Sequence, residues 1–350
     1  MNADTVIVGG GIVGLCTAAA AVHRGDTVVV VDPGSAATAV SAASGGLIRR
    51  FDLGGRLGDL ATAGFDRLRE SAQTCAAFHR TGALTLQYSS QALPTHIRAR
   101  TMLYAARAMR QRWPQITVPP NVIGVFEDGA GWVDAPVLLA TARTELADRG
   151  VEFVTDRVDR LVVDQRRIGG VVTGGGRSIT ASRVVVAAGS STTGLAATAG
   201  VDHPLRTRRI GYCYLRLGSD RTAGLPTIVD RVSGTWVRPC RDPELVLIGR
   251  RQEIFGVPAE IRHEISDADV HEIRTAIAQL LPEAADAPLV GGITAYDVAR
   301  PDPADPPLRH CVEPRGLTVV AGWNGAGFKA APAIAELALG DRVSVEGEES

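Results

Sequence analysis

The first 32 residues hold two short apolar runs separated by a glycine turn and an alanine-rich stretch. Residues 5–8 are an apolar run rich in β-branched side chains, and "TVVVVD" repeats that pattern and ends at Asp32. Both runs are typical of buried strands. Between them, residues 9–14 are rich in glycine, and "LCTAAAAVHRG" predicts a helix that ends at Gly25. The pattern therefore predicts a strand, a turn, a helix and a second strand in about 30 residues.

Further along, apolar runs and turns alternate without a fixed period. "GVEFVTDRVDRLVVD" predicts a strand and a turn at 150–164, and residues 169–191 predict a hairpin leading into a buried strand. A long β-rich region follows, with "IGYCYLRLG", "GTWVRPC" and "ELVLIGRR", and apolar periodicity predicts a helix over 265–281. Near the end of the chain, residues 316–340 predict a strand, a glycine turn and a helix. We expect a mixed α/β (α+β) fold in which the chain leaves the first domain near residue 85 and later returns.

The glycine turn has the spacing of a dinucleotide-binding motif. Gly9 permits the tight turn, Gly11 lets a pyrophosphate approach the backbone, and Gly14 lets the helix pack against the strand. The helix N-terminus supplies amide groups and partial positive charge to the phosphates. Asp32 is placed to accept a hydrogen bond from a ribose hydroxyl. The small residues after Asp32 suit a loop around an extended cofactor. A simple NAD enzyme would instead continue with regularly alternating strands and helices.

Composition excludes several classes of function. The net charge of −1 gives no reason to expect binding to nucleic acid or to an anionic membrane, and no apolar run reaches the length of a membrane span. Five scattered cysteines and seven unclustered histidines predict neither disulfides nor a metal site. With no signal-peptide pattern at the N-terminus, we expect a cytoplasmic protein.

One lysine, Lys329, stands among 37 lysine and arginine residues. Arginine-rich coding can leave a lone lysine by chance. However, lysine carries a compact charge that arginine does not reproduce, and Lys329 lies between a glycine turn and an apolar helix.

Six segments in this order resemble the FAD-dependent D-amino-acid oxidase superfamily, with the nearest likeness to glycine oxidase and monomeric sarcosine oxidase. They are "VIVGGGIVGL", "SAASGGLIRR", "GWVDAP", "VVVAAG", "ARPDPADPP" and "AGWNGAGFKAAPAIAEL". The resemblance covers residues 4 to about 340. It implies a Rossmann-like FAD-binding domain interleaved with a β-sheet substrate-binding domain.

The expected FAD-binding domain comprises residues 1–85, 140–205 and 297–342, and the substrate-binding domain comprises 86–139 and 206–296. Residues 343–350 form an acidic tail that we expect to be disordered. The cofactor contacts implied by the motifs and the resemblance are Gly9, Gly11, Ile12, Val13, Gly14, Asp32, Pro33, Ser41, Ser44, Gly45, Gly46, Leu47, Val158, Ala188, Gly189, Gly325, Ala326, Gly327, Phe328 and Lys329.

The resemblance also implies residues at the substrate. Arg300 matches the arginine that holds the substrate carboxylate in glycine oxidase, and Lys329 matches the carboxylate-binding lysine of sarcosine oxidase. Arg49 and Tyr296 match substrate-facing and flavin-facing residues of the latter enzyme. On the predicted strands, Tyr214 and Trp236 would cover the substrate, although core packing explains these aromatic residues equally well. No metal ligand is expected.

Two positions depart from sarcosine oxidase. Thr294 stands where that enzyme attaches its flavin to cysteine, so we expect non-covalent FAD. Leu247 stands nearest to the position of an oxygen-activating lysine, which leaves the electron acceptor open.

The expected activity is FAD-dependent oxidation of a small amino acid or N-substituted amino acid by hydride transfer to flavin N5. The imine would hydrolyse, and O2 would be reduced to H2O2. A dehydrogenase with another electron acceptor and a non-catalytic flavin-binding subunit are the alternatives. The substrate's identity and the oligomeric state stay open.

Overall fold

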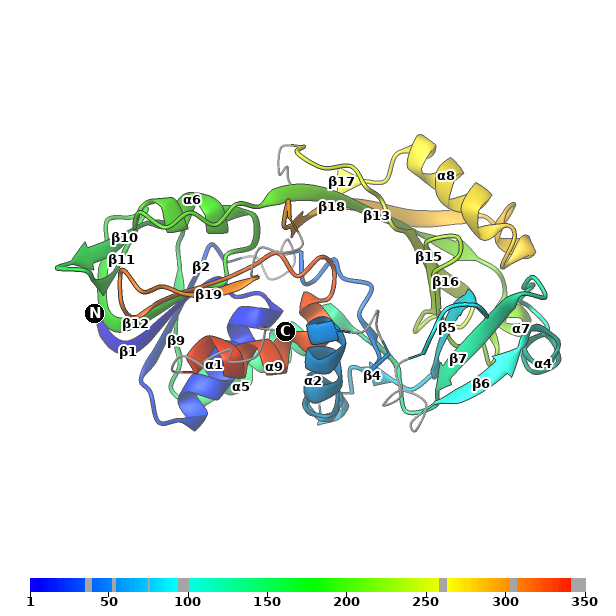
Figure 1. Cartoon of the computed structure of the whole chain (residues 1–350), viewed down its shortest axis with the longest axis horizontal. Helices are drawn as coiled ribbons and strands as arrows, with labels where there is room; N and C mark the ends of the chain where they lie inside the picture. The colour runs from blue at the N-terminus through cyan, green and yellow to red at the C-terminus, as the bar shows by residue number, and fades with distance from the viewer. Residues whose placement is uncertain are drawn as a thin grey trace. The chain divides into compact units, whose positions relative to one another are not determined.

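The computed structural model describes residues 1–34, 40–51, 55–74, 76–93, 101–257, 263–302 and 307–340. The chain divides into two compact units (Figure 1). Unit 1 comprises 1–42, 136–207 and 297–350, and unit 2 comprises 43–135 and 208–296. The tail expected to be disordered, 343–350, lies outside the described residues.

Unit 1 alternates strands and helices, as the predicted nucleotide fold requires. Its elements are β1 (Asn2–Val8), α1 (Ile12–His23), β2 (Val28–Asp32), α5 (Ala135–Asp148), β9 (Glu152–Thr155), β10 (Val158–Asp164), β11 (Arg167–Thr173), β12 (Ser178–Val186), η1 (Gly189–Ser191), α6 (Thr192–Ala197), β19 (Leu308–His310), β20 (Leu317–Val320) and α9 (Gly327–Leu339).

The sheet of unit 1 is parallel at its centre. Its order is β10-β11-β12-β1-β2-β9, and β20 pairs with the last part of β12. The β1–β2 register joins Thr5 to Val28 and Val8 to Val31, so both strands end at the same edge. Central parallel strands are covered on both faces, which explains why β2 is an unbroken run of buried valines.

Helices α1 and α9 pack against each other and run in the same direction (Figure 1). Arg24, at the end of α1, donates to the Leu339 carbonyl near the end of α9 at 2.7 Å and forms a 3.0 Å ion pair with Glu336. Since the two helices have 12 and 13 residues, their N-termini also lie at one end. Each helix follows a parallel strand, so both N-termini lie at the carboxyl edge of the sheet.

Unit 2 is mainly antiparallel β-structure. Its elements are β3 (Leu47–Ile48), α2 (Gly55–Thr74), β4 (Phe78–His79), β5 (Ala83–Tyr88), β6 (Met102–Ala105), α4 (Ala106–Arg112), β7 (Val122–Glu127), β8 (Gly131–Val133), β13 (Arg206–Arg216), α7 (Ser219–Thr222), β14 (Thr227–Asp230), β15 (Thr235–Pro239), β16 (Leu245–Arg250), β17 (His263–Glu264), α8 (Asp267–Ile277), η2 (Pro282–Ala284) and β18 (Leu289–Ala299).

The main sheet of unit 2 has the order β17-β18-β13-β16-β15-β14-β5-β7-β6, and a small sheet has the order β3-β8-β4. Side chains alternate across β15: Val237 joins the large apolar core, whereas Trp236 joins a smaller cluster on the other face. Helix α8 supplies Val270, Ile273 and Ile277 to the large core.

The expected mixed α/β fold class is confirmed, as are the expected helix at 265–281 (α8) and the closing strand and helix (β20 and α9). The first crossing between units occurs after Ala42, whereas the sequence suggested residue 85. Residues 43–85 belong with unit 2 because β3 and β4 pair with β8, while β5 pairs with β7 and β14.

Candidate functional site

The glycine turn of unit 1 has no room for side chains. A Cβ on Gly14 would lie 1.9 Å from the Gly9 carbonyl oxygen, and one on Gly9 would lie 2.4 Å from the Ala187 oxygen. Gly9 also has φ +110°, which favours glycine. Helix α1 then starts at Ile12; its N-cap residue, Gly11, has no side chain to cap it, and its first turn has no acidic residue. The tight turn and the helix start that follows it are compatible with the pyrophosphate that the motif predicts.

The side chains of Asp32 and Ser41 accept hydrogen bonds from backbone amides in and just after the glycine turn. Asp32, at the end of β2, accepts a 2.7 Å hydrogen bond from the Gly10 amide and a 2.9 Å bond from the Gly34 amide. Ser41 accepts a 3.1 Å bond from the Ile12 amide through its hydroxyl. Each carboxylate oxygen of Asp32 can accept a second hydrogen bond, so these contacts are compatible with its expected role at a ribose.

The end of β12 lies beside the same turn. The Ala187 amide donates to the Val8 carbonyl at 2.8 Å, and the Cα of Ala188 lies 3.2 Å from the point where a Gly9 Cβ would be. Ala188 and Gly189 thus come together with the glycine turn. Val158, at the start of β10, is buried in the apolar core of unit 1. Pro33 follows Asp32 directly and is exposed.

The turn before α9 is tightly folded. Gly322, Asn324 and Gly325 all have positive φ, at +82°, +51° and +87°. Helix α9 begins two residues after Gly325, with Ala326 as an N-cap that offers no side-chain hydrogen bond. Phe328 is buried against the core. The segment Gly325–Lys329, predicted to contact the cofactor, therefore comprises the first residues of α9 and the two residues before them.

Lys329 is the third residue of α9 and is only 7% exposed. A helix N-terminus carries partial positive charge, so it disfavours a buried cation and favours an anion. The lysine charge and the helix amides would act together on an anionic ligand.

Arg300 is held against the same turn. Its Nε donates to the Gly322 carbonyl at 3.0 Å, and its backbone amide donates to Oδ1 of Asn324 at 3.2 Å. The turn at 322–325 therefore connects Arg300 to the start of the helix that carries Lys329. Of the cations predicted in unit 1, Arg300 contacts this turn and Lys329 lies in the helix that follows it.

The remaining predicted cofactor contacts, Ser44 to Leu47, belong to unit 2. The Gly45 carbonyl accepts a 2.7 Å hydrogen bond from Nε of Arg238, and a Cβ on Gly45 would lie 2.7 Å from the Trp236 indole. The Gly46 carbonyl accepts from the Val133 amide at 2.8 Å. Because Gly46 has φ +68° and no space for a Cβ, this segment also requires glycine.

Trp236 and Tyr214 belong to one cluster. Tyr212 joins them: its ring lies 5.8 Å from Tyr214 and 5.9 Å from Trp236, in edge-to-face geometry. We call Tyr212, Tyr214 and Trp236 the aromatic face. The Trp236 indole also covers Gly249, where a Cβ would lie 2.2 Å from the ring. Tyr214 and Trp236 are half-buried, whereas Tyr212 is buried.

Arg49 differs from its neighbour Arg50. Arg50 forms a 2.7 Å ion pair with Asp66 and stacks over Phe65 at 3.9 Å. Arg49 forms no ion pair within the described residues, and the buried Nε atoms of both arginines have no hydrogen-bond partner there. Arg50 therefore has a structural role. The guanidinium of Arg49 is not used in an ion pair with a described residue.

Glu127 keeps the backbone after Arg49 in place. It is a buried residue whose carboxylate accepts from the amides of Arg50 at 2.8 Å and Phe51 at 2.9 Å.

Thr294 and Tyr296 alternate along β18 with Ile293 and Ala295, so they point to the other side of that strand. Ile293 and Ala295 join the cluster around the aromatic face. The Thr294 hydroxyl is buried and has no partner among the described residues. Tyr296 is buried, and its ring lies 6.0 Å from His263.

Leu247 is fully buried on β16 and lies opposite Arg238 of β15. Sequence reasoning missed Arg238. The signal was the pattern "GTWVRPC", which places an arginine two positions after Trp236 and therefore on the same face of the strand.

The described cysteines are poor nucleophiles. Burial raises the pKa of Cys16 to about 12, and those of Cys213 and Cys311 to about 11. Burial also raises the pKa of Cys240. A thiol with so high a pKa supplies little thiolate near neutral pH. Within the described ranges, no three His, Cys, Asp or Glu residues are grouped so that they could hold a metal ion.

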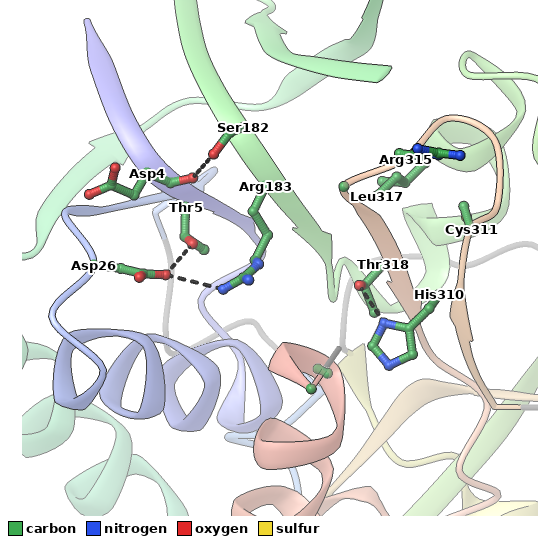
Figure 2. Close-up of a pocket in the computed structure, with 13 residues that line it drawn as sticks. Asp4, Thr5, Asp26, Ser182, Arg183, His310, Cys311, Arg315, Leu317 and Thr318 are labelled. Carbon is green, nitrogen blue, oxygen red and sulfur yellow. Dashed lines mark hydrogen bonds and ion pairs between the residues drawn. The ribbon is translucent and has the colours of Figure 1, made fainter. Parts of the chain in front are cut away.

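A cavity of about 640 Å³ lies at the opposite edge of the sheet of unit 1 (Figure 2). It is lined near the start of β1 by Asp4 and Thr5, and Ala338 and Gly340 mark the end of α9. Figure 2 shows Asp26 receiving hydrogen bonds from Thr5 at 2.6 Å and Arg183 at 3.3 Å. No predicted site residue lines this cavity. Parallel sheets bind ligands at the carboxyl ends of their strands, which is the other edge.

Comparison with known proteins gives one family and a shared fold. The sequence model of the family DAO, described as "FAD dependent oxidoreductase", matches residues 4–339. A search of curated proteins gave no significant match. In the described residues, no helix is both long and apolar enough to cross a membrane.

Three solved structures illustrate the fold. L-proline dehydrogenase from P. horikoshii has 18% identity and a TM-score of 0.83, over 96% of this chain and 93% of that one. Glycine oxidase from Geobacillus kaustophilus has 20% identity and a TM-score of 0.79, over 96% and 93%. Fructosamine oxidase (Amadoriase II) from Aspergillus fumigatus has 20% identity and a TM-score of 0.76, over 97% and 86%. At such identities, the likeness establishes the fold alone.

Proposed function

The chain belongs to the DAO family of FAD-dependent oxidoreductases, and on this premise we propose that it oxidises the C–N bond of a small amino acid or N-substituted amino acid. The observation that carries the proposal is the turn at 322–325, which joins Arg300 to the helix start bearing the buried Lys329. Two cations beside a helix N-terminus suit a carboxylate.

The dinucleotide part of FAD would be held by unit 1. The glycine turn and the start of α1 would receive the pyrophosphate, and Asp32 would accept from a ribose hydroxyl. The further contacts from unit 1 would come from Ile12, Val13, Pro33, Ser41, Val158, Ala188, Gly189 and the residues Gly325 to Lys329. Those from unit 2 would be Ser44, Gly45, Gly46 and Leu47.

When bound, FAD would supply a two-electron acceptor for the hydride of the substrate α-carbon. The residues of the chain have the tasks of binding and orientation. Arg300 and Lys329 would hold the carboxylate, with Arg49 as a third cation. Tyr296, Tyr214 and Trp236 would line the space around the substrate and exclude water. The oxidised product is an imine, which hydrolyses in water.

Molecular oxygen is the acceptor that we favour, with H2O2 as its product. A dehydrogenase that passes its electrons elsewhere is the second candidate, supported by the buried Leu247 where a lysine would activate oxygen. The name of the structural neighbour L-proline dehydrogenase is compatible with that candidate. A non-catalytic flavin-binding subunit would have no use for three cations at the expected carboxylate position.

The test is to mix the purified flavoprotein, without oxygen, with a panel of amino acids and N-methyl amino acids, and to record flavin absorbance. We expect bleaching by one class of substrate and rapid recovery when air is admitted. Bleaching without recovery would identify a dehydrogenase. If no compound in the panel bleaches the flavin, the proposed reaction is wrong.

A further inference from the structure

Trp132 of unit 2 is packed between two basic side chains of the same unit. It is 3% exposed and lies on β8, the middle strand of the small sheet. The His79 ring stacks on its indole, with ring centroids 3.8 Å apart and planes at 8°, and the guanidinium carbon of Arg238 lies 3.9 Å from the indole. Two groups this close to one ring cannot share a face, because their atoms would overlap. His79 and Arg238 therefore cover opposite faces of Trp132.

The same part of unit 2 holds the backbone of Ser44–Leu47. Nε of Arg238 donates to the Gly45 carbonyl at 2.7 Å, and the Val133 amide donates to the Gly46 carbonyl at 2.8 Å. Strand β3, which follows directly, pairs with β8. The position of this segment therefore depends on the guanidinium that packs on Trp132.

His79 lies where a positive charge is unfavourable. Its Nε2 is buried and has no hydrogen-bond partner among the described residues, so a proton on this nitrogen would have no acceptor there. Burial lowers the pKa of His79 from its ordinary value of 6.5, as do the charges of Arg241 and Arg238, whereas Asp134 opposes them. These are the charges of the described residues that act on the ring. His79 is therefore neutral at pH 7.

A proton on His79 would put a second cation against the indole that Arg238 already covers. The two like charges would be separated by one ring, in a buried place where water screens them little. Either side chain can relieve the repulsion by leaving the indole. Arg238 has the longer side chain, and its departure would break the hydrogen bond to the Gly45 carbonyl.

We propose that His79 is a pH-sensitive switch: when it takes up a proton, it displaces Arg238 from the Gly45 carbonyl and loosens the segment Ser44–Leu47. Because Arg238 lowers the pKa of His79, proton uptake and the contact with Gly45 oppose each other. The contact is complete where His79 is neutral and weakens as the pH falls below about 6.5. The switch lies within unit 2 and goes beyond the proposed function, since it is independent of the substrate.

Hydrogen–deuterium exchange of the purified flavoprotein, measured by mass spectrometry, tests the switch, because exchange rates report local opening. We expect the peptide spanning residues 44–48 to exchange about 3- to 10-fold faster at pH 5.5 than at pH 7.5, after correction for intrinsic rates, since one pKa unit of repulsion corresponds to a tenfold change in an equilibrium. A peptide from β7 (Val122–Glu127) serves as the reference for opening of unit 2 as a whole. His79→Phe keeps a stacked ring that takes up no proton, so it should remove the acceleration.

Two exposed positions supply further variants. Arg241 is 63% exposed, and its charge lowers the pKa of His79. In Arg241→Gln, the acceleration should therefore begin at a higher pH than in the wild type. His271→Gln is the matched control, because His271 is an exposed histidine on α8 of the same unit. It should keep the wild-type pH profile.

Three outcomes overturn the inference. The first is an equal corrected exchange rate of the wild-type segment at both pH values, which needs no variant to fold. The second is the wild-type acceleration in His79→Phe, because another group would then cause it. The third is an Arg241→Gln profile that coincides with the wild type. The proposed function fails by a different observation, the absence of flavin bleaching, which leaves these exchange rates unaffected.

Discussion

Lys329 is a buried lysine at the start of a helix, where its charge and the helix amides can act on the same anionic ligand. A buried ammonium at the start of α9 meets the positive end of the helix dipole. We predict that Lys329→Met lowers kcat/KM for the best substrate by about 10- to 150-fold, the loss of a charge-assisted contact of about 1.5–3 kcal/mol. Stopped-flow flavin reduction and steady-state kinetics measure this effect.

The thermal midpoint of the FAD-free variant, measured beside the wild type, separates an effect on stability from an effect on the reaction. Lys329→Arg is the control, because it keeps the charge and should recover part of the activity. Unchanged flavin reduction in Lys329→Met would mean that the lone lysine has no part in the reaction.

Sequence reasoning identified residues whose type is unusual at their position. Lys329 stood out because it is the chain's only lysine, and the glycines stood out by their spacing. Arg238 was not found, because the pattern "GTWVRPC" places it on the strand face of Trp236 but does not show that this arginine, one of 36, is buried. The contrast between Arg49 and Arg50 was equally out of reach, because it depends on Asp66 and Phe65.

Helix α1 depends on the absence of a side chain at Gly14. A Cβ there would lie 1.9 Å from the Gly9 carbonyl oxygen, so the helix would have to move away from the turn. We predict that Gly14→Ala abolishes retention of FAD during purification and lowers stability by about 1–3 kcal/mol, the usual effect of overpacking. Flavin content per protein and urea unfolding measure the two effects.

Gly194→Ala is the matched control within unit 1, because Gly194 lies in α6 and a Cβ there would have no atom within 4 Å among the neighbouring groups. This substitution should keep the flavin and raise stability by about 0.5–1 kcal/mol, through a better helix propensity. A Gly14→Ala protein with full flavin content would show that the turn tolerates a side chain.

Helix α8 is fixed by a polar network around Asp269. Ser266 caps the helix by accepting from the Asp269 amide at 3.2 Å, and its hydroxyl donates to the Asp269 carboxylate at 2.6 Å. Arg209 forms an ion pair with this carboxylate, and Gln252 donates to it at 3.0 Å. The network therefore connects α8 to β13 and to the end of β16.

These contacts determine how the stability of this region depends on pH. Burial by itself raises the pKa of Asp269, but hydrogen bonds, first from Ser266 and then from Arg209, outweigh it and lower this pKa below its ordinary value. The stabilisation is therefore fully present above the unfolded-state pKa of about 3.9 and is lost as the pH falls through the folded-state value.

We predict that Asp269→Asn lowers the free energy of unfolding by about 1–3 kcal/mol at pH 7. The difference from the wild type should shrink as the pH falls below about 4, because the carboxylate of the unfolded wild type then takes up a proton, whereas that of the folded protein does so only at a lower pH. Urea unfolding at pH 7, 5 and 3.5 measures the trend. A difference that grows at low pH would show that the carboxylate is not what stabilises α8.

For the whole molecule, local patterns predicted the elements better than the division between units. Strand β2 and the last residues of β1 and β12 are continuous buried runs, and their identity follows from composition alone. The first crossing was misplaced because β3, β4 and β5 pair with strands far along the chain, such as β8 and β14. Long-range pairing of this kind leaves no local signal.

The attachment of FAD is a property of the whole molecule, and it sets how stability responds to free cofactor. Thr294 offers no thiol, and burial raises the pKa of every described cysteine. We predict that acid precipitation releases the flavin into the supernatant. Since a reversibly bound ligand stabilises the folded state by mass action, each tenfold increase in free FAD above its dissociation constant should add about 1.4 kcal/mol.

A thermal-shift titration of the FAD-free protein measures this stabilisation, and riboflavin serves as the control. Riboflavin lacks the pyrophosphate that the glycine turn and the start of α1 would hold, so we expect it to raise the melting temperature far less than FAD. Flavin that stays in the acid pellet, with a melting temperature independent of added FAD, would require a covalent bond from a residue other than Thr294. Riboflavin as effective as FAD would mean instead that the glycine turn does not bind the pyrophosphate.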